Sequence, residues 1–511
     1  MKPLKSFQII ISNSHFLMSL CRSQFFFVKN TSLLSVGLKG STGKQLSRLL
    51  GKSQPTPKNS VLGSSFFKTS PPSITSKIYG MKHTNGQSLF TQKRPFSTTK
   101  TIWEEAKVVK KSKWPANSNI KLGYLCIGTS VLVFAIVILG GLTRLTESGL
   151  SITEWKPVTG AIPPMSQEDW EEEFRKYQDS PEFKLLNSHI TLEEFKFIFL
   201  MEWSHRLLGR VIGMVFVLPT LYFIARRQVS PPVAFKLLGI CALIGLQGAI
   251  GWWMVYSGID EKLLEERRSK PTVSQYRLTA HLAAAFLVYC TMISTGFGIL
   301  RDHAIMKDPQ TYLEIFQKIQ SPSLKLFRRL SKGLLGLVFL TAMSGAMVAG
   351  LDAGLIYNTF PHMGDDYIPS MNELMSPVFS RLADQSDLFW RNMFENPATV
   401  QLNHRILAIT TFCSVFALHM YSHKIRSIIP RHAYKWLNIS MGLVSLQLTL
   451  GICTLLWLVP TELAAAHQGG ALALLTGVLM TVCHLKKPSR TNLMLLKNFL
   501  HKAKANNVAL K

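Results

Sequence analysis

Eight long apolar runs lie within the C-terminal four fifths of this 511-residue chain, and they limit the folds that it can adopt. A helix needs about 20 apolar residues to cross about 30 Å of hydrocarbon, and most of the runs are near this length. The sequence therefore predicts an all-α membrane protein with eight transmembrane helices. The runs lie near residues 122–142, 197–223, 235–256, 275–300, 333–351, 398–422, 436–459 and 462–485.

The second half of the chain repeats motifs of the first half. The sequence Leu-Gln-Gly-Ala-Ile-Gly at residues 246–251 corresponds to Leu-Gln-Leu-Thr-Leu-Gly at residues 446–451. Each half has four spans, an even number, so both halves cross the membrane in the same direction. This predicts two tandem four-helix bundles related by pseudo-two-fold symmetry along the membrane normal. The expected parts are a first bundle at 122–300 with an outer loop at 143–196, a linker at 301–332 and a second bundle at 333–485.

The N-terminal region is strongly basic and contains no acidic residue before Glu104. Its first hundred residues hold 15 of the Lys and Arg residues, together with many Ser and Thr. This composition is typical of a mitochondrial transit peptide, which we expect at residues 1–96; a disordered basic tail is the alternative. Because the net charge of +28 is concentrated here and in particular loops, we expect no nucleic-acid binding.

The charges of the loops predict the orientation of the spans. Residues 143–197 carry 11 acids against 6 bases, and residues 351–397 carry 7 acids against 2 bases, whereas the alternate loops are basic. The positive-inside rule then places both termini in the matrix and predicts a multi-pass protein of the mitochondrial inner membrane. A matrix segment at 97–121 and a basic matrix tail at 486–511 complete the expected topology.

The acidic loop of the first half also contains aromatic residues between residues 165 and 196. This pattern fits an amphipathic helix on the membrane surface. A solvated helix that packs on the bundle fits the same pattern.

Four histidines lie inside apolar runs and form two matched pairs. The sequence Glu-Trp-Ser-His-Arg at residues 202–206 corresponds to Gln-Leu-Asn-His-Arg at 401–405, and His281 corresponds more loosely to His467. A single intramembrane His can be a helix–helix hydrogen bond. Four at repeated positions and equal depth favour two haem sites, each with two axial imidazoles, side by side near the outer face. The expected iron ligands are His205, His281, His404 and His467.

The two halves differ three residues before the first His of each pair. Glu202 and His205 share a helix face, whereas Gln401 precedes His404. A carboxylate can move protons and an amide cannot, so we interpret Glu202 as a candidate catalytic residue of a reactive first site. The alternative is that Glu202 only orients His205.

Three arginines are candidate partners of haem propionates. Arg206 and Arg405 directly follow the expected ligands, and Arg144 precedes the first outer loop. Arg144 has no basic counterpart in the second half, where Ala349 stands, and it could instead only snorkel. None of the seven cysteines lies in an outer loop or in a C-x-x-C-H motif, so any haem must be held by axial ligands and packing.

With these motifs the chain resembles the mitochondrial haem A synthases of cytochrome oxidase assembly, over about residues 115–487. The resemblance implies oxidation of the C8 methyl group of haem O to a formyl group. It implies that His205 and His281 hold haem O as substrate, beside Glu202, and that His404 and His467 ligate haem b. It also suggests a matrix ferredoxin as electron donor, with haem O synthase, oxidase assembly factors and a second copy of the chain as further possible partners. Bacterial relatives often carry a cysteine pair in the first outer loop, which this chain lacks.

Two other kinds of protein share part of the pattern. A dihaem b-type cytochrome linked to quinol would share the histidines, but it would place its haems at opposite faces. A duplicated transporter would share the repeat, but it would more often contain helices broken by Gly or Pro.

Overall fold

The structure is a computed structural model that describes residues 114–156, 159–260, 271–489, 492–494 and 496–498. Within these residues every regular element is a helix, apart from one isolated bridge between Met363 and Asp366. Eight of the helices are long and apolar enough to cross a membrane. The predicted all-α fold with eight transmembrane helices is confirmed, and the pseudo-two-fold symmetry stays a prediction.

Several predicted segments lie wholly or partly outside the described residues. The expected transit peptide at 1–96 lies outside them altogether. The same holds for most of the N-terminal segment at 97–121 and for much of the C-terminal tail at 486–511.

The first half contributes four long helices, which begin at identifiable caps. Asn119 accepts a hydrogen bond from the Lys121 amide at the start of the first helix. Thr191 and Glu194 form a capping box, so the second long helix begins five residues before its apolar run. The four helices are α3 (Ile120–Leu145), α5 (Leu192–Ala225), α6 (Pro231–Ile259) and α8 (Gln275–Lys307).

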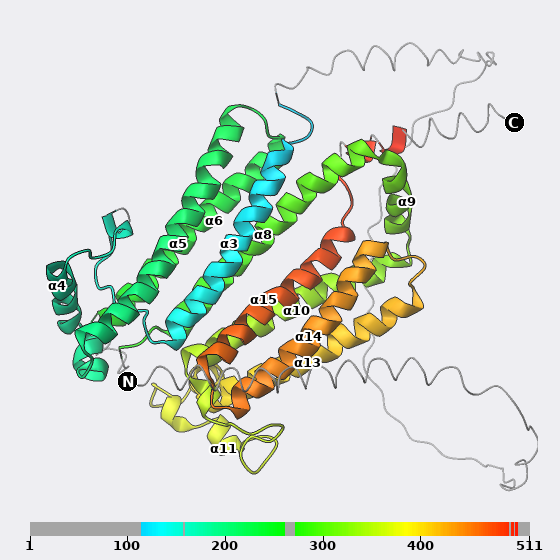
Figure 1. Ribbon diagram of the computed structural model, residues 1–511. Helices are drawn as coiled ribbons and strands as arrows, with labels where there is room; N and C mark the ends of the chain where they lie inside the picture. The colour runs from blue at the N-terminus through cyan, green and yellow to red at the C-terminus, as the bar shows by residue number, and fades with distance from the viewer. Residues whose placement is uncertain (1–113, 157–158, 261–270, 490–491, 495, 499–511) are drawn as a thin grey trace, which may run out of the picture. The chain divides into compact units, whose positions relative to one another are not determined.

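The second half contributes four more long helices. The last two form a tight hairpin, and Leu458 and Val459 adopt left-handed backbone conformations in its short turn. The shorter helix α9 (Pro309–Gln320) lies in the linker between the halves, at the opposite end of the bundles from α4 and α11 (Figure 1). The long helices are α10 (Leu324–Gly350), α13 (Pro397–Lys424), α14 (Arg431–Leu456) and α15 (Thr461–His484).

The outer segment of the first half packs on the bundle. Helix α4 places Tyr177 against Phe195 of α5, with ring centroids 5.2 Å apart, and Trp170 against Phe199 at the same distance. The structure therefore shows that the apolar face of α4 packs on α5 of the bundle. The elements of this segment are η1 (Thr159–Ala161), α4 (Gln167–Gln178) and η2 (Phe183–Asn187).

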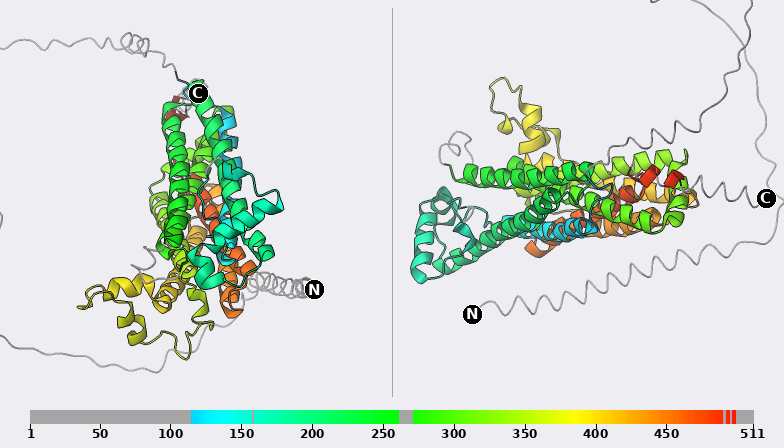
Figure 2. Two further views of the ribbon diagram at one scale, coloured as in Figure 1. Left: turned by 90° about the vertical axis from the view of Figure 1, so that its left-hand side faces the viewer. Right: turned by 90° about the horizontal axis from the view of Figure 1, so that it is seen from above.

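The outer segment of the second half contains only short helices, and α12 leads directly into α13. These are η3 (Ala353–Leu355), α11 (Met371–Leu374), η4 (Pro377–Phe379) and α12 (Leu388–Glu395). The two halves meet through α3 and α8 on one side and α10 and α15 on the other (Figures 1 and 2). The Tyr289 and Thr476 hydroxyls are hydrogen-bonded at 2.8 Å across this contact, and Gln468 Nε2 donates to the Val137 carbonyl at 2.7 Å.

Candidate functional site

The structure brings the four predicted histidines together as two pairs. The rings of His205 on α5 and His281 on α8 have centroids 6.5 Å apart. Those of His404 on α13 and His467 on α15 are also 6.5 Å apart. Each pair therefore joins two helices of one half.

This spacing fits a metal held between two imidazoles. A metal–imidazole bond of about 2 Å on each side, plus about 1 Å from nitrogen to ring centre, places the centroids about 6 Å apart. The Nδ1 atoms of His205, His281 and His467 are buried and have no hydrogen-bond partner among the described residues. Two axial histidines are the ligand set of a b-type haem, so both pairs fit such a group.

A glycine on the preceding long helix lies against each of the four imidazoles. A Cβ atom built on Gly140, Gly251, Gly345 or Gly451 would lie 2.8, 2.9, 3.1 or 2.8 Å from the Cε1 atom of its histidine. These glycines belong to α3, α6, α10 and α14, in chain order before the helices of the histidines. A larger residue at any of the four positions would displace the ring.

A glutamine holds the helix of the second histidine in each pair. The Gln247 amide donates to the His281 carbonyl at 3.0 Å, and the Gln447 amide donates to the His467 carbonyl at 2.8 Å. The matched hexapeptides at 246–251 and 446–451 thus supply both a glutamine and a glycine to each pair. The sequence analysis noted these hexapeptides only as evidence of duplication.

The first histidine of each pair has different surroundings in the two halves. Ser344 Oγ lies 2.8 Å from His404 Nδ1 and donates to the Thr341 carbonyl at 2.7 Å. Leu139 occupies the corresponding position before Gly140 in the first half. No local sequence pattern marks Ser344, because its role depends on a contact between α10 and α13.

Glu202 is 3% exposed, and its carboxylate accepts four hydrogen bonds. The Nε and Nη2 atoms of Arg206 donate to one oxygen at 3.0 and 2.6 Å. Ser151 Oγ and the Ile152 amide donate to the other oxygen at 2.7 and 2.9 Å. The carboxylate thus ties α5 to the start of the first outer segment.

Gln401 is 2% exposed and ties α13 to the second outer segment with the opposite polarity. Its amide nitrogen donates to the Ala353 and Tyr357 carbonyls at 2.9 and 3.1 Å. Arg405 donates to the carbonyls of Tyr357, Thr359 and His362 at distances from 2.9 to 3.1 Å. The arginine that follows each first histidine is therefore engaged with its own outer segment.

Arg144 joins the two halves. Its Nη2 atom donates to both carboxylate oxygens of Asp352 at 2.9 Å. The second half has no basic residue at the corresponding position, Ala349. It instead supplies Asp352, which pairs with Arg144 of the first half.

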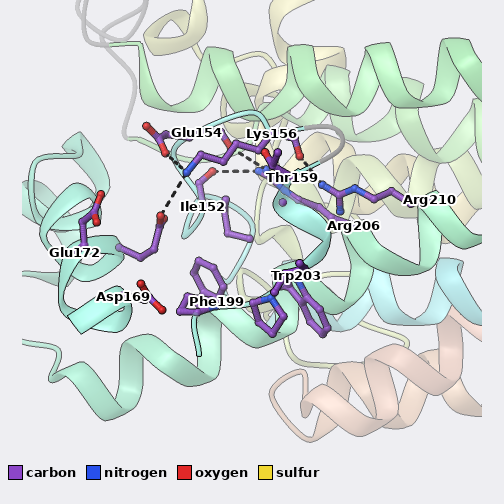
Figure 3. A pocket seen from close by; sticks show the side chains of 15 residues that line it. Ile152, Glu154, Lys156, Thr159, Asp169, Glu172, Phe199, Trp203, Arg206 and Arg210 are labelled. Carbon is purple, nitrogen blue, oxygen red and sulfur yellow. Dashed lines mark hydrogen bonds and ion pairs between the residues drawn. The ribbon is translucent and has the colours of Figure 1, made fainter. Parts of the chain in front are cut away.

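A cavity of about 300 Å³ lies between the outer segment and α5 of the first half. Figure 3 shows Phe199 and Trp203 on one side of it and Glu154 and Lys156 on another. Arg206 and Arg210 also line it, and they donate to the carbonyls of Ile152 and Lys156 at 3.1 and 2.8 Å. The first site therefore has a charged cavity on its outer side.

Glu182 is a second buried carboxyl group in the outer segment of the first half, and it is 5% exposed. Burial raises its pKa from 4.5 to about 8, and the charge of Glu202 acts in the same direction. A hydrogen bond from the Tyr177 hydroxyl opposes this shift. Glu182 Oε2 has no hydrogen-bond partner among the described residues. Nothing in the sequence distinguished this glutamate from the other acids of the loop.

The family model for cytochrome oxidase assembly proteins, COX15-CtaA, matches residues 123–479. The chain is 55% identical to Heme A synthase COX15 of Saccharomyces cerevisiae over 399 residues, which cover 77% of this chain and 82% of that protein. It is 45% identical to Heme A synthase COX15 of Homo sapiens over 363 residues, which cover 71% of this chain and 81% of the human protein.

A third relative combines two proteins in one chain. The Heme A synthase-mitochondrial ferredoxin fusion protein of Schizosaccharomyces pombe is 50% identical over 363 residues. The match covers 70% of this chain and 59% of the fusion protein.

Proposed function

This chain belongs to the cytochrome oxidase assembly family that includes the haem A synthases, and we propose that it oxidises the C8 methyl group of haem O to a formyl group. It is a haem A synthase and a multi-pass membrane protein of mitochondria. Two hydroxylations followed by loss of water convert a methyl group to a formyl group. The basic loops support the inner membrane as its location, with both termini in the matrix.

The observation that carries the proposal is the presence of two imidazole pairs with the same 6.5 Å spacing in different surroundings. We assign His205 and His281 to the substrate haem O, and His404 and His467 to a resident haem b. Haem b, when bound, supplies a redox centre that can pass electrons toward the first site. The four glycines and the two glutamines set the positions of the rings that hold both haems.

Glu202 has two possible roles in the first site. Its four hydrogen bonds support a positioning role, in which a fixed negative charge holds Arg206 and the start of the outer segment in place. Transfer of a proton to or from the substrate site is the alternative, and it would require one of these contacts to open. We favour the positioning role, because each of the two carboxylate oxygens of Glu202 already accepts two hydrogen bonds.

Among the three candidate arginines, Arg206 is the one that lines the outer cavity. We assign it to a propionate of haem O, with the carboxylate of Glu202 holding the guanidinium in orientation. Arg405 has the corresponding position in the second half. Arg144 is a weaker candidate, because Asp352 already accepts two hydrogen bonds from it.

A mitochondrial ferredoxin is the proposed electron donor. The fusion protein of Schizosaccharomyces pombe, by its name, joins a haem A synthase to such a ferredoxin, and fused proteins commonly act together. Haem O synthase, oxidase assembly factors and a second copy of the chain are further proposed partners.

The experiment that tests this function identifies the porphyrins bound to the purified protein. The full chain is expressed with a source of haem O and a reducing ferredoxin system, and the extracted haems are separated by chromatography. We expect protohaem together with haem O and haem A. Protohaem alone would instead indicate an electron-transfer cytochrome, and the lack of any Soret band would indicate a protein without haem.

A further inference from the structure

Ser344 on α10 contacts one ring nitrogen of His404 on α13. The Ser344 hydroxyl has a single hydrogen, which it donates to the Thr341 carbonyl at 2.7 Å. With its hydrogen on that carbonyl, Ser344 Oγ offers a lone pair to His404 Nδ1, 2.8 Å away. In this arrangement His404 carries its hydrogen on Nδ1, and the lone pair of Nε2 is free for a metal.

The first site lacks this arrangement. Leu139 stands where Ser344 stands, and both residues directly precede the glycine that lies against the histidine ring. His205 Nδ1 is buried and has no hydrogen-bond partner among the described residues. No described contact fixes the tautomer of His205.

The second histidines of the two pairs do not share this difference. In both, the glutamine amide donates to the backbone carbonyl and also lies 3.3 or 3.5 Å from the ring Nε2 atom of His281 or His467. Both also have a glycine against the ring and an Nδ1 atom with no partner among the described residues. Among the described residues, His404 thus differs from the other three histidines in having a polar contact at Nδ1.

A hydrogen bond from the Nδ1–H group of a metal-bound histidine holds the ring in place and makes it a stronger ligand. Loss of such a bond typically weakens metal binding by about 10- to 100-fold. We propose that the contact of Ser344 with His404 slows the release of haem from the second site, so that this haem stays bound. Leu139 provides no such contact, and the first site can therefore exchange its haem. This inference rests on the proposed function, which needs one site that takes in haem O and releases haem A.

The test measures how fast haem leaves each site. Purified full-length protein in detergent is mixed with excess apomyoglobin, and the transfer of protohaem is followed by absorbance. Ser344→Ala should transfer protohaem about tenfold faster than the wild type or more, because the Nδ1–H group loses its acceptor. Ser344→Thr keeps the hydroxyl and should behave as the wild type. Ser445→Ala is the matched control, since the hydrogen bond that Ser445 Oγ makes within the described residues goes to the Met441 carbonyl on its own helix.

Two further measurements keep the result independent of folding defects. The low-spin electron paramagnetic resonance signal of the haem should shift in Ser344→Ala and not in Ser445→Ala, because only the former changes the ligand strength of His404. Leu139→Ser, which introduces the acceptor into the first site, should slow the release of haem A about threefold or more.

The failure of this inference differs from the failure of the proposed function. Equal transfer rates and unchanged signals in Ser344→Ala, Ser445→Ala and the wild type would overturn the inference, provided that His404→Ala still abolishes protohaem binding. If His404→Ala retains protohaem, the assignment of the second site itself is wrong.

Discussion

Glu202 in the first half and Gln401 in the second half occupy corresponding positions, but they form hydrogen bonds of opposite direction with their outer segments. Glu202 accepts hydrogen bonds from Ser151 and Ile152, whereas Gln401 donates to the carbonyls of Ala353 and Tyr357. Both residues tie the helix of the first histidine to the outer segment of their own half. The comparison supports the proposed positioning role of Glu202, because its carboxylate accepts hydrogen bonds that tie α5 to the outer segment.

The largest expected effect comes from Glu202→Gln. The new amide places a donor against the Ile152 amide or against Arg206, and it leaves the Arg206 charge partly buried without its partner. Breaking such a buried pair costs about 3–5 kcal/mol. We expect a large loss of thermal stability in detergent and a haem A to haem O ratio at least tenfold below the wild type. Glu168→Gln, at an exposed position on α4, should change neither quantity.

The double variant Glu202→Gln with Arg206→Met separates the two roles of Glu202. Removal of the arginine charge eliminates the unpaired cation, so a positioning role predicts that the double variant regains stability and forms as much haem A as Arg206→Met alone, which lacks the same propionate partner. If the double variant regains stability but forms clearly less haem A than Arg206→Met, Glu202 acts in proton transfer and the positioning role is wrong.

The glycines that lie against the histidine rings should be equally intolerant in both halves. In Gly451→Ala the new Cβ would lie 2.8 Å from His467 Cε1, so the ring must move. Overpacking of this kind costs about 1–3 kcal/mol. This energy corresponds to a loss of haem b affinity of up to about 100-fold. The protohaem content of the purified variant reports this loss.

Gly442→Ala is the matched control on the same helix, because its Cβ would meet no atom within 4 Å. Gly140→Ala on α3 should leave the protohaem content unchanged and impair only the first site. A variant of Gly451 with normal protohaem content would show that the glycine has no part in placing His467.

The outer segment of the first half, which contains Glu182, should lose stability as the pH rises. The folded-state pKa of Glu182 is raised to about 8 from its usual 4.5, so the folded protein binds this proton more tightly than the unfolded chain. The resulting stabilisation is complete below about pH 4.5 and is lost as the pH rises through 8. Glu182→Gln stays neutral, so its melting temperature should exceed that of the wild type at pH 9, and the difference should shrink toward pH 5. Parallel melting curves of both proteins at every pH would contradict the assignment.

The smallest expected effect comes from the ion pair that joins the halves. Arg144 and Asp352 are bonded at 2.9 Å, but the Asp352 side chain is 60% exposed. Solvent-exposed ion pairs of this kind contribute about 0.2–1 kcal/mol. A double-mutant cycle with Arg144→Gln and Asp352→Asn should give a coupling energy in this range by thermal unfolding. A coupling above about 2 kcal/mol would mean that this pair holds the two halves together.

The sequence was sufficient to predict the eight helices and the four histidines, because both leave strong local patterns. Apolar runs of membrane-spanning length report a helix directly. The repeated His-Arg motifs at residues 205 and 404 and the second pair of histidines marked the facing rings. The extension of α5 back to Leu192 was missed, because the capping box at Thr191 lies among charged residues outside the apolar run.

Contacts between distant segments could not be predicted in the same way. Arg144 and Asp352 are 208 residues apart, and nothing local to either residue specifies the other. The repeated glycines and glutamines were visible as a pattern, but a pattern in one helix does not reveal which ring of another helix it meets. Ser344 was overlooked for the same reason, since a serine in an apolar helix usually bonds only its own backbone.

We propose that the second histidine pair holds a resident haem b and that the first pair holds the substrate. The most direct test compares the extracted haems of His205→Ala and His404→Ala at matched protein level. We expect His205→Ala to keep its protohaem and to form no haem A, and His404→Ala to lose its protohaem. Loss of protohaem in His205→Ala with full retention in His404→Ala would contradict this division of the two sites.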